Sequence, residues 1–143
     1  MKNSGRDKLP VGKLSIDILG PILDSMPTAG LPVSSRIGMD AGIVKINGNK
    51  IFSSSQVIVG REAGTAEQLV SDLVKKIANL GKPIVIDPVV LIPVGTSSDI
   101  IRRVLLEICE SAESRGMIVG KGHTEITTLV KEITLIATVF ASV

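Results

Sequence analysis

The stretch GIVKINGNKIFSSSQVIV, residues 42–59, holds the strongest structural signal in this sequence. Asn47-Gly48 stands between two runs of β-branched and apolar residues. Both residues tolerate the positive φ angles that a two-residue hairpin turn requires. The stretch therefore predicts a β-hairpin whose second strand continues to Val59.

Apolar residues at helical spacing predict helices over 16–26, over 65–80 and from about 98 to 115. Gly20-Pro21 predicts a kink or two short turns in the first helix. Runs rich in β-branched residues predict further strands at 84–92, 117–119 and about 130–140. Within the first of these runs, Asp87-Pro88 indicates either a bulge or an edge position, because proline cannot donate to a strand ladder.

This order of elements predicts an α+β fold with a mixed or antiparallel sheet and helices on one face. The strands are too apolar to leave the second face exposed to water: in residues 133–140, one set of alternate residues is fully apolar and the other is mixed. A large apolar surface left uncovered usually marks an interface. We therefore expect the second face of the sheet to form a homodimer.

Composition narrows the possible functions of this chain of 143 residues, which is long enough for one domain. It has no Trp or Tyr, and 16 basic residues stand against 14 acidic ones, which argues against binding nucleic acid. The first 13 residues lack the apolar segment of a secretory signal, and the apolar run 135–143 is too short to span a bilayer. We expect a cytoplasmic protein that does not bind membranes.

The segment Gly120–Glu125 is the best candidate for a ligand site. Its two glycines free backbone amides to approach an anion, and Lys121 and Thr124 add donors. The alternative is a tight turn between two strands, in which His123 serves only as a local hydrogen-bonding group. Asp40 is either a magnesium ligand in a glycine-flanked loop or a turn-forming residue.

Two other polar positions favour structural interpretations. Asp87 is more typical of a bulge or turn than of a metal ligand. The single cysteine, Cys109, lies in a helical apolar pattern and is expected to be a small core residue rather than a reactive thiol.

Four segments, taken in order, resemble the PurM-like ATP-binding superfamily, which includes aminoimidazole ribonucleotide (AIR) synthase, HypE, thiamine-monophosphate kinase and selenophosphate synthetase. The first two are GKLSIDIL (12–19), similar to the opening of HypE-type proteins, and IGMDAGIV (37–44), similar to the family's G-[ED]-D-A-A-V loop. The other two are KIANLGKP (76–83), similar to N-D-[VL]-A-A-M-G-A-x-P, and VGKGHTEI (119–126), similar to V-G-G-H-T-E-V.

The polar residues 1–13 predict a flexible arm. The resemblance implies a PurM N-terminal-like domain over 14–143, without the family's second domain. It also implies ATP and magnesium binding near a dimer interface. The residues at the corresponding positions are Gly38, Asp40, Lys75, Lys76, Gly120, Lys121, Gly122, His123 and Thr124.

Departures from the family pattern argue against tight magnesium binding. The family's Asn-Asp pair falls on Lys75 and Lys76, and another family aspartate falls on Ser54 or Ser55. Only Asp40 keeps a carboxylate at a magnesium position, and magnesium needs carboxylates to bridge it to phosphates.

We therefore expect a degenerate, non-catalytic domain with weak or lost binding of ATP and magnesium, and no catalytic residue is assigned. The alternative is the ATP-binding half of a split enzyme, completed by a partner chain that carries the second domain.

Overall fold

The computed structural model describes residues 11–25 and 41–143. The chain divides into two compact units, residues 1–31 and residues 32–143. Residues 1–10 of the expected arm, and the candidate residues Gly38 and Asp40, lie outside the described residues.

In the first unit, helix α1 spans Ile16–Asp24 and begins after Ser15, whose side chain makes no capping hydrogen bond. Its end at Asp24 comes before the expected Met26. Two separate short turns at Gly20-Pro21 are not formed, because Pro21 lies inside one continuous helix. A single internal proline removes only one backbone hydrogen bond, which a short helix can lose without ending.

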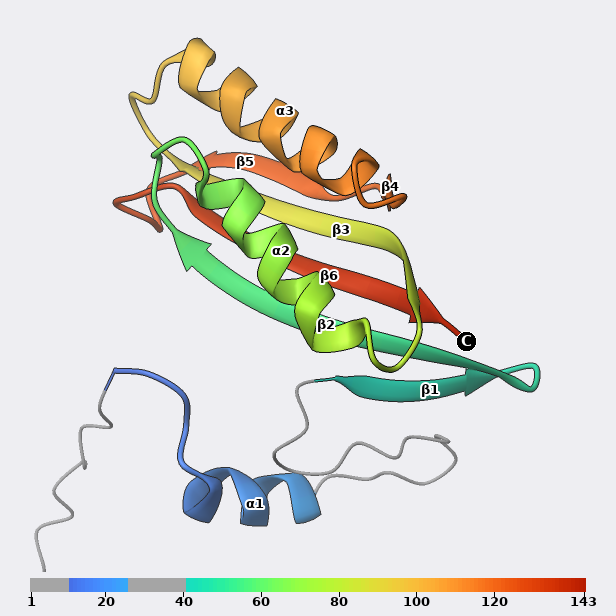
Figure 1. Cartoon of the computed structure of the whole chain (residues 1–143). Helices are drawn as coiled ribbons and strands as arrows, with labels where there is room; N and C mark the ends of the chain where they lie inside the picture. The colour runs from blue at the N-terminus through green and yellow to red at the C-terminus, as the bar shows by residue number, and fades with distance from the viewer. Residues whose placement is uncertain (1–10, 26–40) are drawn as a thin grey trace, which may run out of the picture. The chain divides into compact units, whose positions relative to one another are not determined.

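The second unit is one mixed sheet with two helices (Figure 1). Its elements are β1 (Gly42–Ile46), β2 (Asn49–Val59), α2 (Thr65–Ile77), β3 (Lys82–Pro93), α3 (Ser98–Glu113), β4 (Ile118–Val119), β5 (His123–Thr127) and β6 (Thr134–Ser142). Strands β1, β2, β6 and β3 are antiparallel neighbours in that order, and β4 and β5 both pair with β3 in parallel. The predicted α+β class with a mixed sheet is confirmed.

The predicted hairpin is also confirmed. Strands β1 and β2 pair from Gly42↔Ser53 to Ile46↔Asn49, around a turn in which Asn47 and Gly48 have φ angles of 50° and 83°. Both angles lie in the left-handed region that these two residue types tolerate. The local sequence signal alone accounts for this turn.

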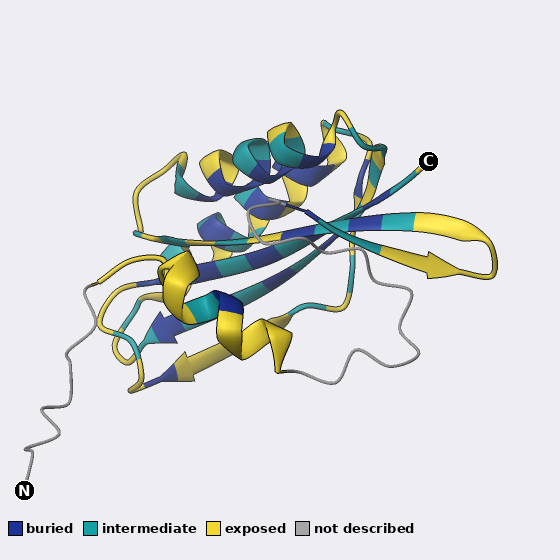
Figure 2. Cartoon of the chain, turned by 90° about the horizontal axis from the view of Figure 1, so that it is seen from below, coloured by how far each residue is buried: buried dark blue, intermediate teal, exposed yellow. Residues whose placement is uncertain are grey.

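Helices α2 and α3 lie on the same face of the sheet (Figure 1), and the core fills the space beneath them. Figure 2 shows burial alternating along the strands. The largest fully buried side chains are aliphatic, in keeping with the scarcity of aromatic residues: Leu69, Leu73, Ile77, Ile86, Ile92, Ile133 and Leu135. None of the helices in the described part of the chain is long and apolar enough to cross a membrane.

The opposite side of the sheet, called here the open face, carries the alternate residues of the same strands. Within residues 41–143, neither helix lies on this side. Val57 and Val59 of β2 are 57% and 58% exposed there, while the positions on β3 and β6 are half-buried. The apolar residues of the open face are Ile51, Val57, Val59, Val85, Val89, Leu91, Ile136 and Phe140.

Substitution of Gly122 tests how closely the start of β5 packs against β3. Its φ angle is +57°, and an added Cβ would lie 2.6 Å from the carbonyl oxygen of Pro88. Gly116 has a similar φ angle of +71° with nothing within 4 Å of an added Cβ, so it is a matched control. Gly116→Ala should cost about 1–2 kcal/mol of unfolding free energy from backbone strain alone. Gly122→Ala should cost a further ~1–3 kcal/mol from the backbone clash.

Chemical denaturation of both variants measures this difference. Equal destabilisation by the two substitutions would show that Gly122 does not pack against Pro88 as described.

Candidate functional site

The candidate segment Gly120–Glu125 is not a free loop between strands. Val85 and Ile86 pair with Ile118 and Val119 of β4, whereas Val89 already pairs with His123 of β5. Two residues of β3, Asp87 and Pro88, therefore face three residues, Gly120, Lys121 and Gly122. One extra residue opposite a strand defines a β-bulge.

The bulge follows from Pro88, which has no N–H and so interrupts the ladder on β3. The sequence left open a bulge or an edge position for Asp87-Pro88. A bulge does lie beside Asp87-Pro88, but the extra residue is on the neighbouring strand: Asp87 and Pro88 themselves keep a regular register with β6, and the register shift within β3 falls between Pro83 and Val85. The edge interpretation is wrong because β3 lies between β6 and the pair β4 and β5. The expected loop Gly120–Glu125 is corrected accordingly: residues 120–122 bulge, and 123–127 form a strand that the sequence analysis missed.

Both glycines of the bulge are required by close neighbours. An added Cβ on Gly120 would lie 1.7 Å from Oδ1 of Asp87, so the Asp87 carboxylate occupies the space that a side chain would fill. The Gly120 amide also donates to the Ile86 carbonyl at 2.8 Å. Gly122 turns the chain back into β5 with its positive φ angle. These glycines therefore let the backbone approach β3 closely.

A pocket of about 220 Å³ lies between this bulge and helix α3. The bulge and β5 contribute four of the candidate residues predicted from sequence, and α3 supplies most of the opposite wall. The lining residues are Pro88, Leu105, Ile108, Cys109, Val119, Lys121, Gly122, His123 and Thr124. The structure thus brings Lys121, Gly122, His123 and Thr124 together, with Gly120 adjoining them in the chain.

The polar groups at this pocket are mostly hydrogen-bond donors. Lys121 is exposed and carries a positive charge, and Thr124 offers a hydroxyl group. His123 Nε2 lies 3.1 Å from Glu125 Oε2, and both side chains are more than half exposed. Glu125 is not among the lining residues, so the pocket lining itself contains no carboxylate. This arrangement suits a small anion rather than a cation.

Cys109 corrects the sequence analysis. It was expected in the core, but its side chain is exposed and lines this pocket from α3. The buried residues of that helix are Val104, Ile108, Ser111 and Ala112. Around the helix, Cys109 is about 100° from Ile108 and about 60° from Ala112, so it lies at the edge of the buried stripe.

Lys75 and Lys76 lie apart from the pocket lining, in the last turn of α2. Lys76 Nζ donates to Gln56 Oε1 at 2.6 Å, and Asp72 accepts from Gln68 at 2.7 Å nearby. The two lysines lie at the carboxyl end of α2, where positive charge is favourable because this end of the helix dipole is negative. Ser54, one of the two serines at a family aspartate position, is buried, whereas Ser55 is exposed on the open face.

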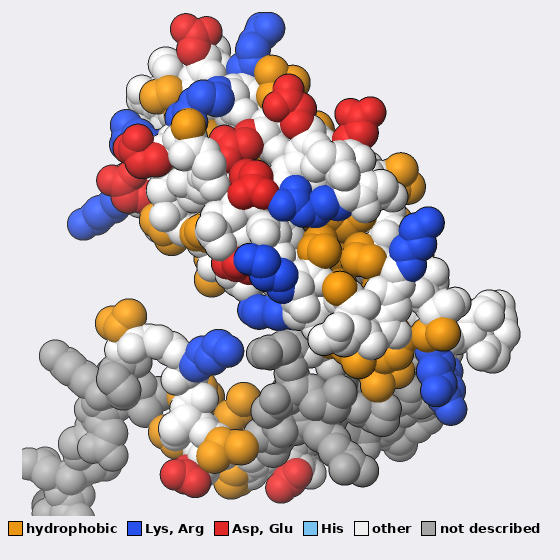
Figure 3. Space-filling view, in the orientation of Figure 1, with side chains coloured by type: hydrophobic (Ala, Val, Ile, Leu, Met, Phe, Trp, Pro, Cys, Tyr) orange, Lys and Arg blue, Asp and Glu red, His pale blue; other side chains and the backbone are white. Residues whose placement is uncertain are grey.

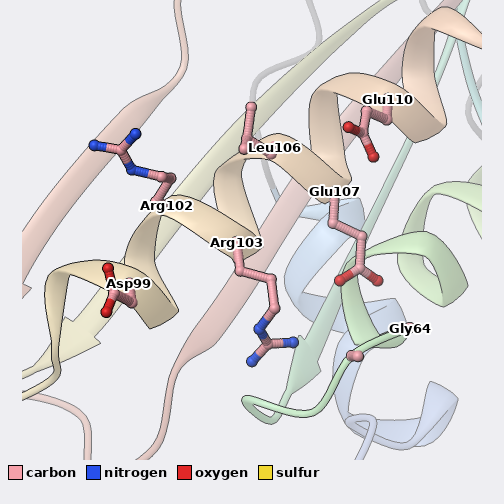
Figure 4. A pocket seen from close by; sticks show the side chains of 8 residues that line it. Gly64, Asp99, Arg102, Arg103, Leu106, Glu107 and Glu110 are labelled. Atoms are coloured by element: carbon pink, nitrogen blue, oxygen red, sulfur yellow. The ribbon is translucent and has the colours of Figure 1, made fainter.

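A second pocket, of about 530 Å³, was not indicated by the sequence (Figure 4). It lies between α3 and the start of α2, and both signs of charge line it: Asp99, Arg102, Arg103, Glu107 and Glu110. Figure 3 likewise shows acidic and basic side chains interleaved over the face that carries α2 and α3. The mixture gives this pocket no strong preference for an anion.

The amino terminus of α2 at this pocket already holds a carboxylate. Gly64 precedes the helix and has no side chain to cap it, and the Glu67 amide donates instead to Glu107 Oε1 of α3 at 3.1 Å. Arg103 donates from Nη2 to the Arg61 carbonyl. Its Nη1 is buried without a partner among the described residues. Glu107 therefore fills the position that an external anion would take.

Glu107→Ala should lower the unfolding free energy by about 1 kcal/mol, because it removes this cap. Glu107→Gln keeps an acceptor oxygen and should retain most of the stability. Glu110→Ala, on the same helix but without such a bond, is the control and should stay within about 0.5 kcal/mol of the unmodified protein. Thermal melts of the three variants decide, and equal effects at positions 107 and 110 would contradict the capping role.

No group of three or more His, Cys, Asp or Glu side chains within residues 11–25 and 41–143 is arranged to hold a metal ion. The donor set around the bulge therefore does not fit magnesium, which prefers carboxylate oxygens. Asp40, the one carboxylate at a family magnesium position, is outside the described residues.

No protein-family model matches this sequence, and no curated protein matches it either. Solved structures do. AaThiL, complexed with AMPPCP and TMP, is 18% identical, with a TM-score of 0.72 over 89% of this chain. A chain of the HypE–HypF complex is 17% identical, with a TM-score of 0.66 over 88%. A chain of PurLQS from Thermotoga maritima is 13% identical, with a TM-score of 0.66 over 78%.

The chain has a PurM-like fold. At these identities the match establishes architecture, and it confirms the resemblance that the four sequence segments indicated. The chain spans 40% of the ThiL chain, 42% of the HypE–HypF chain and 21% of the PurLQS chain. The activities of those longer proteins therefore bear on this chain only as proposals.

Proposed function

We propose that this protein is a non-catalytic, homodimeric PurM-like domain that binds the phosphate group of a small ligand weakly and without magnesium. The pocket beneath α3 carries this proposal, because the glycine-bounded bulge, Lys121 and Thr124 converge on it. A charged donor, a hydroxyl and a closely approaching backbone are the groups that recognise a phosphate.

The size of the pocket supports a small ligand. Pockets that enclose a whole drug-sized ligand or cofactor usually measure about 300–1,000 Å³. This one measures about 220 Å³, which accommodates a phosphate group but leaves the rest of a nucleotide outside. Binding of ATP through one phosphate alone would be weak, because most of the ligand surface would remain in water.

The absence of acidic residues at positions where the resembled family carries them supports a non-catalytic role. Lys75 and Lys76 stand where the resembled family has Asn-Asp, and the described carboxylates form no metal-binding group. A nucleotide whose magnesium is not held cannot have its phosphate charges neutralised in the usual way.

The open face supports a homodimer. Eight apolar residues lie on it, in strands that alternate between this face and the core. An apolar sheet face of this extent is stabilised when a second sheet packs against it at about 10 Å. The second copy is the simplest partner, because the same face on both copies forms a two-fold interface.

A second candidate function is the ATP-binding half of an ATP-dependent enzyme completed by another chain. Its support is the fold shared with a ThiL chain in a complex with AMPPCP, which is more than twice as long as this chain. Tight ATP binding that a chelator abolishes would favour this function over the first.

Lys121→Ala should weaken phosphate, sulfate or ATP binding by roughly tenfold or more, because a charge-assisted contact contributes about 1.5–3 kcal/mol. The melting temperature should stay nearly constant, because Lys121 is exposed. Lys131→Ala, another exposed lysine and absent from the pocket lining, should leave affinity unchanged. Calorimetric titration with and without a chelator measures these affinities, and failure of the unmodified protein to bind any anion at millimolar concentration would reject the site.

The homodimer should appear in sedimentation at micromolar concentration, with on the order of 2,000 Å² of total surface buried. Val57→Asp should dissociate it, because a carboxylate would be buried on the open face. Leu129→Asp is the control, because Leu129 is 83% exposed and follows β5 outside the open face. A stable monomer in the unmodified protein would reject this part of the proposal.

A further inference from the structure

A row of polar residues crosses the middle of the open face. Ser55 of β2 pairs with Thr138 of β6, and Thr138 pairs with Asp87 of β3, so the three side chains lie on one line across the strands. The Ser55 and Thr138 hydroxyl oxygens are 2.7 Å apart. The neighbouring row Val57–Ile136–Val89 is apolar on these three strands and continues to His123 on β5, and the row on the other side, Ser53–Phe140–Val85, is mostly apolar.

The two ends of the polar row differ chemically. One end, Ser55, is an exposed hydroxyl that can donate a hydrogen bond. The other end, Asp87, is a half-buried carboxylate that makes no hydrogen bond or ion pair with any described residue. Its Oδ1 occupies the space that a Cβ of Gly120 would need, so the carboxylate remains on the open face.

Two directions of the two-fold axis, along the polar row and along the strands, place the ends of this row against different partners. The axis must lie in the plane between the sheets, because each copy presents the same face to the other. If the axis runs along the row, Asp87 faces Asp87 of the second copy, and two carboxylates become buried against each other. If the axis runs along the strands through Thr138, the row is reversed and Asp87 faces Ser55 of the second copy.

We propose that the Ser55–Thr138–Asp87 row sets the axis of the homodimer, with Asp87 of each copy accepting a hydrogen bond from Ser55 of the other. This inference rests on the proposed dimer through the open face. A carboxylate buried at an interface needs a hydrogen-bond donor, and like charges placed opposite one another oppose association. The row therefore selects one pairing of the two sheets and disfavours the other.

Exchanging the two ends of the row tests the inference. In Ser55→Asp, each copy would place a new carboxylate against Asp87 of the other, so the dissociation constant should rise by roughly a hundredfold or more. Adding Asp87→Ser to Ser55→Asp moves the acid to the other end of the row and again places it opposite a hydroxyl. This double variant should recover most of the affinity.

Ser53→Asp is the matched control, because it adds an acid to the open face one row away, beside Phe140. It should also weaken the dimer, but Asp87→Ser should not rescue it, because position 53 does not face position 87 in the proposed pairing. Sedimentation measures the dissociation constants, and thermal melts check that each variant folds.

The outcomes separate the inference from the dimer on which it rests. Rescue at position 55 but not at position 53 supports the row as the determinant of the axis. Dissociation by Val57→Asp, combined with no effect of Ser55→Asp or no rescue by Asp87→Ser, overturns the inference while the dimer stands. An unmodified protein that is monomeric, or a dimer that Val57→Asp leaves intact, overturns the open-face dimer and the inference with it.

Discussion

The insertion of β6 between β2 and β3 is the interaction on which the rest of the structure depends. Strands β2 and β3 both precede β6 in the chain, yet neither pairs with the other, and β6 forms a long antiparallel ladder with each. The alternate residues of β6, Leu135, Ala137, Val139 and Ala141, are buried on the side of the helices. Without this strand, the sheet would separate into the hairpin and the β3 group, and neither part would retain a complete core.

The same strand also creates the open face, because side chains alternate strictly along it. A register slip of one residue would exchange Ile136 and Phe140 with Ala137 and Val139, and bring Thr138 into the core. Burial of the helix side therefore fixes which residues reach the open face. The hydroxyl of Thr138 lies there beside Ser55 because the core requires Ala137 and Val139 on the other side.

Much of this organisation could be predicted from local sequence. The Asn47-Gly48 turn, the helices α2 and α3, and the α+β class follow from turn chemistry and apolar spacing, which act over a few residues. The strand β5 could not be predicted in this way, because HTEIT, residues 123–127, has no strong β-forming pattern. It becomes a strand because β3 offers it a parallel ladder, which depends on residues more than 30 positions away.

The pocket could be predicted only in part, for the same reason. Glycine, lysine and threonine in residues 120–124 indicated a flexible backbone with donors, and four of these residues do meet. The opposite wall comes from α3, and its contribution through Cys109 depends on how that helix is rotated over the sheet. Helical periodicity places Cys109 at the edge of the buried stripe. A small rotation of the helix about its own axis therefore decides whether this side chain lies in the core or in the pocket.

The bulge at Gly120–Gly122 joins the two surfaces to which we assign function. Lys121 contributes to the pocket, whereas the preceding residue, Gly120, makes room for Asp87 on the open face. Both features result from Pro88, which interrupts the ladder on β3 and leaves one extra residue on the neighbouring strand. A straight ladder at this point would remove the loop that exposes Lys121. It would also place a regular strand residue next to Asp87, so the anion pocket and the polar row depend on the same local irregularity.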